Sequence, residues 1–166
     1  MCGIVAAVAD RNIVPILIEG LRKLEYRGYD SAGLALINSA GLQRLRAVGR
    51  VAELAAQVDE TGASGTTGIS HTRWATHGVP CERNAHPHIS GGLAVVHNGI
   101  IENYGILKER LIAKGYTFES ETDTEVLVKL IDSCYEGEPL KALRAALAMV
   151  RGSYALAVLF RDRPDT

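Results

Sequence analysis

The chain lacks three features that would place it in a broad class at once: paired cysteines, excess charge and long apolar runs. Its three cysteines, Cys2, Cys81 and Cys134, are widely spaced without a CxxC pair, which argues against a disulfide framework and for a reducing cytoplasm. The net charge of −1 offers no basic surface for nucleic acid. Residues 1–12 lack the basic start of a signal peptide, and no apolar run approaches the ~18–20 residues of a membrane span. We therefore expect a cytoplasmic protein that binds neither nucleic acid nor membrane.

The length and composition of the chain indicate one globular domain, because 47% of its 166 residues are hydrophobic and can form a sizeable core. Apolar patterning predicts strands at 3–9, 32–37, 42–48, 67–71, 93–97 and 153–160, and helices at 12–24, 51–58, 102–114, 124–135 and 139–150. The first strand is apolar throughout, so we expect it to be buried on both faces, and a long loop is expected between 71 and 93. Strands occur in pairs and helices cluster separately, which favours an α+β fold with antiparallel sheets. The polar segment 161–166 is typical of a linker to a further module.

Cys2 is separated from the amino terminus by Met1 alone, so removal of Met1 would give one residue both a thiol and a free α-amine. A thiol attacks carbonyls as its thiolate, and an α-amine, which titrates near about pH 7.7–8.0, can take its proton. Cys2 is therefore a candidate nucleophile with a built-in base, the alternative being a small apolar residue that starts a buried strand. For Cys134, in an apolar helical stretch, we predict a packing role, and Cys81 lies in a polar turn without an evident role.

Three further polar positions adjoin the predicted elements. Asn98-Gly99 is either a tight hairpin turn or an oxyanion hole formed by a side-chain amide and a backbone N–H, and the local sequence leaves both open. Arg73, beside Trp74, is either a surface salt-bridge partner or a clamp for a planar carboxylate. Asp123, between two threonines, is interpreted as a helix N-cap, with the binding of an ammonium group as the alternative.

Five histidines raise the question of a metal site. His86-Pro87-His88 lacks the i,i+4 helical spacing of the HExxH motif, and Pro87 constrains the loop that carries the two side chains. For the histidines we therefore predict hydrogen bonds that fix loops, and we predict neither a metal nor a cofactor.

Taken together, these segments resemble the class II glutamine amidotransferases, whose nucleophile is an N-terminal cysteine. Within that class they resemble the glutaminase domain of glucosamine-6-phosphate synthase (glutamine–fructose-6-phosphate aminotransferase, isomerising). The segments that carry the resemblance are Met1-Cys-Gly-Ile-Val5, Leu24-Glu-Tyr-Arg-Gly-Tyr-Asp-Ser-Ala-Gly33, His71-Thr-Arg-Trp-Ala-Thr-His-Gly78, Asn84-Ala-His-Pro-His88, Val96-His-Asn-Gly-Ile-Ile-Glu-Asn103 and Ser120-Glu-Thr-Asp-Thr-Glu125. The part from Leu24 to Asp30 distinguishes this branch from amidophosphoribosyltransferases and asparagine synthetases.

The resemblance implies a four-layer αββα sandwich of two antiparallel sheets, with 1–166 as the glutamine amidotransferase domain and the sugar-phosphate isomerase domains absent from this chain. It implies hydrolysis of L-glutamine to L-glutamate and ammonia through a cysteine thioester. In the full-length enzyme, a homodimer, C-terminal isomerase domains of the same polypeptide would use that ammonia to convert fructose 6-phosphate to glucosamine 6-phosphate. The alternatives are a glutamine-binding regulatory domain without turnover and a glutaminase domain that serves another acceptor.

The resemblance also implies roles for individual residues. Cys2 matches the nucleophile, and Asn98 and Gly99 match the oxyanion hole. Arg73 matches the residue that binds the α-carboxylate of glutamine, and Asp123 matches the one that binds its α-ammonium group. A site selective for free glutamine needs such a fixed cation, a fixed anion and a hydrogen-bonding cradle around the amide.

Five other residues match positions around this centre. Thr76 and His77 match a loop beside the substrate, and Trp74 matches a residue associated with gating. Arg27 and Gly28 match the segment next to the nucleophile.

Overall fold

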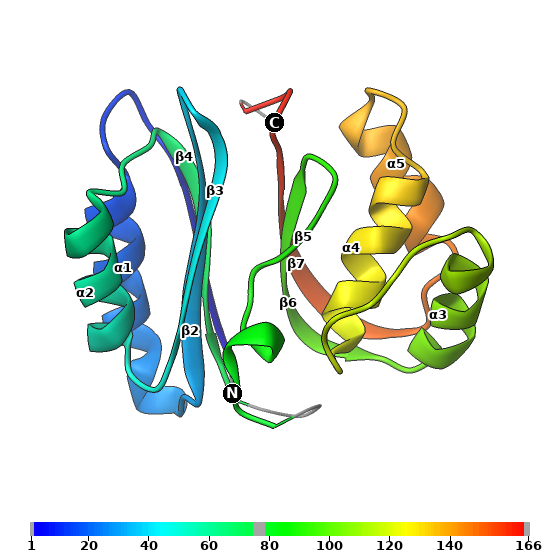
Figure 1. The fold of residues 1–166 in the computed structure, drawn as a ribbon, viewed down its shortest axis with the longest axis horizontal. Coiled ribbons are helices and arrows are strands. Elements are labelled where there is room, and N and C mark those ends of the chain that lie inside the picture. Colours follow the sequence, from blue (N-terminus) through cyan, green and yellow to red (C-terminus); the bar gives the residue numbers. More distant parts are fainter. Residues whose placement is uncertain (1, 75–78, 165–166) are drawn as a thin grey trace.

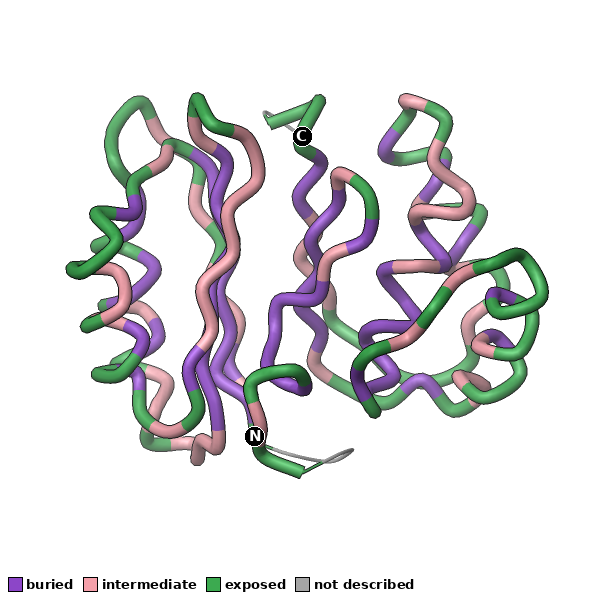
Figure 2. The backbone as a smooth tube through the Cα atoms, viewed as in Figure 1, coloured by how far each residue is buried: buried purple, intermediate pink, exposed green. Residues whose placement is uncertain are grey.

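The computed structural model of the chain describes residues 2–74 and 79–164. Two antiparallel sheets lie face to face, and helices cover the outer face of each sheet (Figure 1). Buried residues follow the strands of both sheets and the inner sides of the helices (Figure 2). This arrangement confirms the predicted α+β fold, a four-layer αββα sandwich. No helix in the described ranges combines the length and the apolar character needed to cross a membrane.

The first half of the chain forms one sheet and its helical layer. The strands are β1 (Gly3–Val8), β2 (Ser31–Asn38), β3 (Gly41–Val48) and β4 (Thr67–Arg73), in the order β1-β4-β2-β3. The helices are α1 (Val14–Leu24) and α2 (Val51–Thr61), and a short 3-10 helix (Glu25–Arg27) follows α1. Pro15 lies in the first turn of α1, where its missing N–H costs no hydrogen bond. Aliphatic side chains of α1, α2 and β2 form the core of this half.

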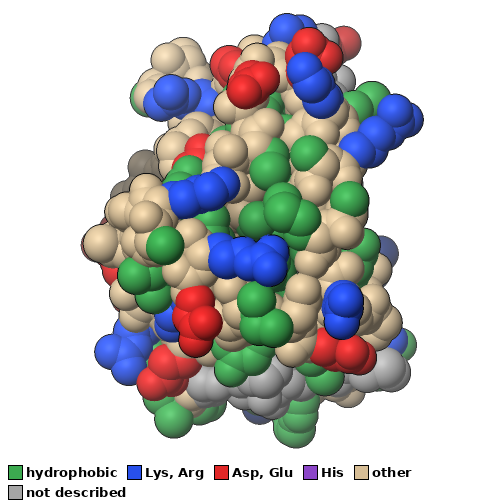
Figure 3. Space-filling view, turned by 90° about the vertical axis from the view of Figure 1, so that its right-hand side faces the viewer, with side chains coloured by type: hydrophobic (Ala, Val, Ile, Leu, Met, Phe, Trp, Pro, Cys, Tyr) green, Lys and Arg blue, Asp and Glu red, His purple; other side chains and the backbone are tan. Residues whose placement is uncertain are grey.

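The second half forms the other sheet and its helices. The strands β5 (His88–Ser90), β6 (Leu93–Ile101) and β7 (Gly152–Phe160) lie in that order, after a 3-10 helix at Glu82–Asn84. The helices are α3 (Tyr104–Ala113), α4 (Asp123–Ser133) and α5 (Pro139–Leu147). Cys134 packs against the core of this half, as predicted. Figure 3 looks onto the side that carries α3 and α5, where acidic, basic and hydrophobic side chains are interspersed.

Side-chain alternation along β4 and β6 decides which residues meet between the sheets. The face of β4 toward the second sheet carries Ile69 and His71, and the facing side of β6 carries Val96 and Asn98. The apolar members of these faces join a thin core of aliphatic side chains. Toward the C-terminal ends of the two strands, polar side chains take their place, and Arg73 continues the polar face of β4. A polar site is therefore built into one end of the inter-sheet core.

The structure corrects three local predictions. Strand β1 is not buried on both faces: within the described residues it pairs with β4 alone, and Val8 near its end is 68% exposed. Strand β6 continues to Ile101 instead of ending at 97, so α3 begins at Tyr104 rather than at 102. The short strand β5 lies in the segment predicted to be loop. The other predicted strands and helices are present, with shifts at their ends.

Candidate functional site

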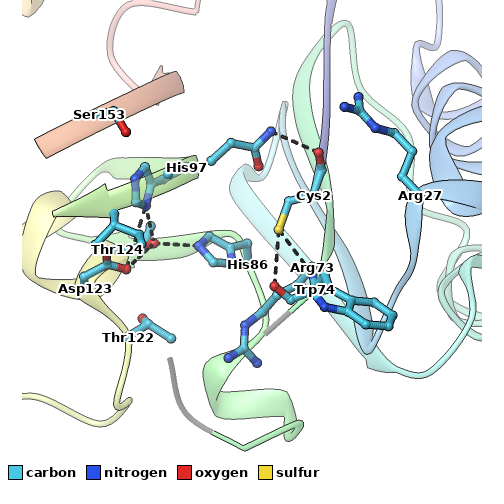
Figure 4. Close-up of a pocket in the computed structure, with 13 residues that line it drawn as sticks. Cys2, Arg27, Arg73, Trp74, His86, His97, Thr122, Asp123, Thr124 and Ser153 are labelled. Atoms are coloured by element: carbon cyan, nitrogen blue, oxygen red, sulfur yellow. Dashed lines mark hydrogen bonds and ion pairs between the residues drawn. The ribbon is translucent and has the colours of Figure 1, made fainter. Parts of the chain in front are cut away.

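A pocket of about 570 Å³ lies beside Cys2 (Figure 4). Figure 1 shows the amino terminus at one end of the sandwich. The start of β1, the end of β4, the end of β6 and the first residues of α4 contribute to its wall. The predicted site residues that line it are Cys2, Arg27, Arg73, Trp74, Asn98, Gly99 and Asp123. The structure therefore brings together residues from five separate segments of the sequence. Thr76 and His77 lie outside the described residues.

Cys2 is half-buried at the pocket wall, and its sulfur contacts the backbone of Trp74 (Figure 4). The Trp74 N–H donates a hydrogen bond to Cys2 Sγ at 3.2 Å. The Cys2 thiol in turn donates to the Trp74 carbonyl oxygen at 3.5 Å. The Trp74 backbone therefore contacts the sulfur through both its N–H and its carbonyl group. The predicted nucleophile is thus exposed to the pocket and held by the segment that follows β4.

Asn98 and Gly99 lie within β6, paired with Ala155 and Tyr154 of β7. The hairpin-turn alternative for Asn98-Gly99 is therefore wrong. Asn98 Nδ2 donates to the Cys2 carbonyl oxygen at 3.2 Å, which places the amide beside the nucleophile. Gly99 has a φ of +126°, and a Cβ there would collide with the Ser153 carbonyl oxygen. Only glycine therefore fits at this position without displacing the backbone of β7.

Arg73 is the last residue of β4, and its side chain is buried rather than on the surface. Its Nη1 lies 3.5 Å from Asp30 Oδ1, so the guanidinium forms a buried ion pair, and the surface salt-bridge alternative is wrong. The Asp30 N–H also donates to the Arg73 carbonyl at 2.7 Å, which ties the two segments together. Figure 4 shows the guanidinium extending along the pocket toward Thr122. A cation fixed in this way suits a carboxylate ligand.

Asp123 opens α4, but it is not the N-cap that the sequence predicted. That position belongs to Thr122, whose hydroxyl accepts a hydrogen bond from the Glu125 N–H at 3.3 Å. The buried carboxylate of Asp123 accepts from the Ile101 N–H at 2.9 Å and lies 3.8 Å from His97 Nδ1. The donor N–H and the positive end of the helix compensate for the burial of a carboxylate. Asp123 is thus a fixed anion in the pocket wall.

The segment after α1 packs against Trp74. Arg27 is half-buried and lines the pocket, while Gly28 itself lies behind the indole. Gly28 has a φ of +100°, and a Cβ there would overlap the Trp74 ring, so glycine allows the indole to lie against the backbone. The indole remains 54% exposed. The predicted position of Arg27 and Gly28 next to the nucleophile is consistent with this packing.

A cluster of buried histidines lies at the pocket: His86 and His97 line it, whereas His71 and His88 do not. The sequence did not predict this cluster. His86 Nε2 and His97 Nδ1 lie 2.6 Å and 3.0 Å from the Thr124 hydroxyl, and His88 Nε2 lies 2.9 Å from the Thr122 hydroxyl. Burial lowers the pKa of His71 to about 4 and lowers that of His86 and His88 well below the ordinary value. These three rings are therefore neutral near pH 7.

The contacts of His86 and His88 confirm the prediction that these histidines fix a loop, since they join the loop before β5 and the first residue of β5 to the start of α4. No group of three or more His, Cys, Asp and Glu side chains within the described ranges is arranged to hold a metal ion. The pocket residues missed by the sequence include Thr122, Thr124 and His97. Their positions in the sequence could have indicated them, because Thr122 and Thr124 flank Asp123 and His97 precedes Asn98.

Comparison with known proteins places the chain in a family. A family model described as "Glutamine amidotransferase domain" matches residues 71–166. The chain is 58% identical to the glutamine–fructose-6-phosphate aminotransferase (isomerizing) of Acinetobacter baylyi and 56% identical to that of Pseudomonas putida, each over 99% of this chain. It spans 27% and 28% of the length of these relatives.

A solved structure shares the fold over nearly the whole chain. The glutamine phosphoribosylpyrophosphate amidotransferase of B. subtilis, complexed with ADP and GMP, matches with a TM-score of 0.81 and 27% identity. The match covers 96% of this chain and 35% of that one. From the family model, the relatives and the shared fold, we conclude that the chain belongs to the glutamine amidotransferase domain family.

Proposed function

We propose that this domain hydrolyses L-glutamine to L-glutamate and ammonia, with Cys2 as the nucleophile. The observation that carries the proposal is one pocket lined by a thiol, a buried guanidinium, a buried carboxylate and a side-chain amide. Free glutamine carries a carboxylate and an ammonium group at one end and a neutral amide at the other. The pocket offers a partner for each of these groups, and membership of the family supports the same ligand.

Recognition of the amino-acid end rests on two fixed charges. Arg73 binds the α-carboxylate, because its planar guanidinium can donate two parallel hydrogen bonds. Asp123 binds the α-ammonium group with its carboxylate at the start of α4. Because both side chains are buried and held by other residues, they are ordered before the substrate arrives, which limits the entropy lost on binding.

The chemistry proceeds at the amide end. The α-amine of Cys2 takes the thiol proton, and the thiolate attacks the side-chain amide carbon of glutamine. Asn98 Nδ2 and the Gly99 N–H donate hydrogen bonds to the oxyanion of the tetrahedral intermediate. The ammonium form of the amine returns the proton to the leaving nitrogen, which departs as ammonia and leaves a γ-glutamyl thioester. Water then attacks the thioester and releases glutamate.

Covalent labelling tests the choice of nucleophile. A glutamine-mimicking electrophile is expected to modify Cys2 and spare Cys81 and Cys134, because only Cys2 has the proposed base and the pocket. All three cysteines are partly accessible, so accessibility alone does not predict this selectivity. Peptide mass mapping locates the adduct, and glutamate release by Cys2→Ala is measured beside it. An adduct on Cys81 or Cys134, or unchanged turnover by Cys2→Ala, would rule out the proposed nucleophile.

Variants of the two charged residues test the binding mode. Arg73→Ala and Asp123→Asn are expected to raise KM for glutamine by about tenfold or more, since a lost hydrogen bond to a charged group costs about 1.5–3 kcal/mol. kcat should change by less than about threefold if both residues act mainly on binding. Asp123→Asn keeps an oxygen for the Ile101 N–H, so the charge is removed while the helix start is preserved.

Arg22→Ala is the matched control, because Arg22 forms an exposed ion pair with Glu19 on α1, away from the pocket. Its KM should equal that of the parent protein. A fall in kcat at constant KM in either pocket variant would contradict the proposed binding roles.

We further propose that 1–166 is the glutaminase domain of a longer, homodimeric cytoplasmic enzyme, whose sugar-phosphate isomerase domains use the ammonia to convert fructose 6-phosphate to glucosamine 6-phosphate. The names of the relatives and the fraction of their length that the chain spans support this acceptor. The test is to supply the full-length protein with glutamine and fructose 6-phosphate. Glucosamine 6-phosphate should form with glutamate, and free ammonia without amino sugar would argue for another acceptor.

A further inference from the structure

His71 lies directly behind the amide of Asn98, across the space between the sheets. His71 belongs to β4 and Asn98 to β6, and His71 Nε2 lies 2.8 Å from Asn98 Oδ1. The ring is buried, with 1% of its surface exposed, and it does not line the pocket. The proposed reaction gives His71 no step of its own. Its contact with an oxyanion-hole residue therefore needs a separate explanation.

The protonation of His71 determines which way the Asn98 amide points. At a pKa of about 4 the buried ring is neutral near pH 7 and carries one N–H. Asn98 Nδ2 faces the Cys2 carbonyl, so the amide oxygen is the atom that faces His71 Nε2, and an amide oxygen can only accept a hydrogen bond. The proton therefore belongs on Nε2. From there it donates to Asn98 Oδ1, which leaves the amide nitrogen on the opposite side.

The contact of Asn98 with Cys2 selects the same orientation. Asn98 Nδ2 donates to the Cys2 carbonyl oxygen at 3.2 Å, and a carbonyl cannot be satisfied by the amide oxygen. The first N–H of Nδ2 is used in this bond, and the second is left for the pocket that Asn98 lines. In the reversed orientation, Oδ1 would face both the Cys2 carbonyl and a developing oxyanion, and repel each.

We propose that His71 is a positioning residue for the oxyanion hole: its Nε2–H holds Asn98 Oδ1, so that Nδ2 faces the nucleophile and the substrate amide. The hydrogen bond joins the two sheets, so it also fixes the distance between Cys2 on one sheet and the oxyanion donors on the other. This inference rests on the proposed role of Asn98. It makes His71 act on kcat without touching glutamine.

Two substitutions of similar size separate donation from packing. In His71→Gln the side-chain amide nitrogen can occupy nearly the place of Nε2 and donate to Asn98, whereas His71→Leu fills the space without a donor. His71→Leu is expected to lower kcat for glutamine hydrolysis by about tenfold or more at an unchanged KM. His71→Gln should lose no more than about threefold. If His71→Leu does not fold, His71→Asn replaces it, because its shorter amide does not reach Asn98.

A second readout separates positioning from general damage to the site. Iodoacetamide alkylates Cys2 by displacement at a saturated carbon, a reaction that forms no oxyanion. The rate of Cys2 alkylation should therefore be the same in the parent, His71→Gln and His71→Leu proteins. A parallel loss of alkylation and turnover would show that His71 merely supports the local structure, and would overturn the inference.

The double-mutant cycle with Asn98→Ala is the decisive experiment. His71→Leu should have almost no further effect on kcat in the Asn98→Ala background, because the group that it positions is gone. Equal fold losses in both backgrounds, or no loss in His71→Leu while Asn98→Ala is impaired, overturn the inference and leave the proposed function intact. An unchanged kcat in Asn98→Ala alone would instead remove the oxyanion role of Asn98 itself.

Discussion

A protein that keeps one additional, uncleavable residue before Cys2 is expected to release glutamate at least about a hundredfold more slowly than a protein that begins at Cys2. The extra residue turns the α-amine of Cys2 into a peptide N–H, which cannot accept the thiol proton. General base catalysis typically contributes about 10²–10⁴-fold to a rate, so its loss accounts for an effect of this size. The added residue would also occupy space beside the nucleophile at the pocket wall.

The same effect can be measured on a single preparation whose N-terminal extension ends in a protease site immediately before Cys2, because the uncut extension also blocks the α-amine. Glutamate release is measured before and after cleavage, and circular dichroism confirms that the fold is unchanged. Activity should appear in proportion to the fraction cleaved, as determined by mass spectrometry. Equal release by the blocked and the cleaved protein would show that the α-amine is not the base.

Asn98→Ala is expected to lower kcat for glutamine hydrolysis by roughly a hundredfold, which is the effect of removing one oxyanion donor in other enzymes. KM should change little, because the side-chain amide donates mainly to the charge that develops in the transition state. The substitution also removes the hydrogen bond to the Cys2 carbonyl, so the thermal midpoint of unfolding must be measured beside the kinetics.

Asn103→Ala is the matched control for this variant. Asn103 also bonds backbone groups through its amide, donating to the Met149 carbonyl at 2.9 Å and accepting from the Arg151 N–H at 2.8 Å, but it lies outside the pocket. Asn103→Ala should therefore lower stability and leave kcat unchanged. An intact kcat with an altered KM in Asn98→Ala would contradict the oxyanion assignment.

The sequence predicted the layers of the fold because the signals for them are local. Strands such as β2 and β6 contain runs of apolar residues, and the helices have regular apolar spacing with Gly or Pro near their ends. The edge position of β1 was missed because an apolar run looks the same in a central strand and in an edge strand. Strand order depends on pairing between residues far apart in the chain, such as Gly3 with Thr72, and no local pattern encodes it.

Seven of the residues that the sequence suggested for the site line the pocket, but the contacts among the pocket residues were not predicted. The segments around Cys2, Arg73 and Asn98 carry distinctive residues, so the resemblance could identify them. The N-cap was misplaced by one residue because Thr and Asp are both good caps, and the extended backbone of Thr122 decides between them. The hydrogen bond between His71 and Asn98 joins two sheets, so only the packing of the sheets reveals it.

Hydrolysis of glutamine through Cys2 requires a γ-glutamyl thioester on that residue, and this intermediate can be trapped during turnover. Protein that begins at Cys2 is mixed with excess L-glutamine, quenched in acid during steady-state turnover, digested, and analysed by peptide mass mapping. A glutamyl adduct is expected on the N-terminal peptide, confined to Cys2 and abolished when hydroxylamine cleaves the thioester. Rapid glutamate release with no adduct on Cys2, or the same release by Cys2→Ala, would contradict it.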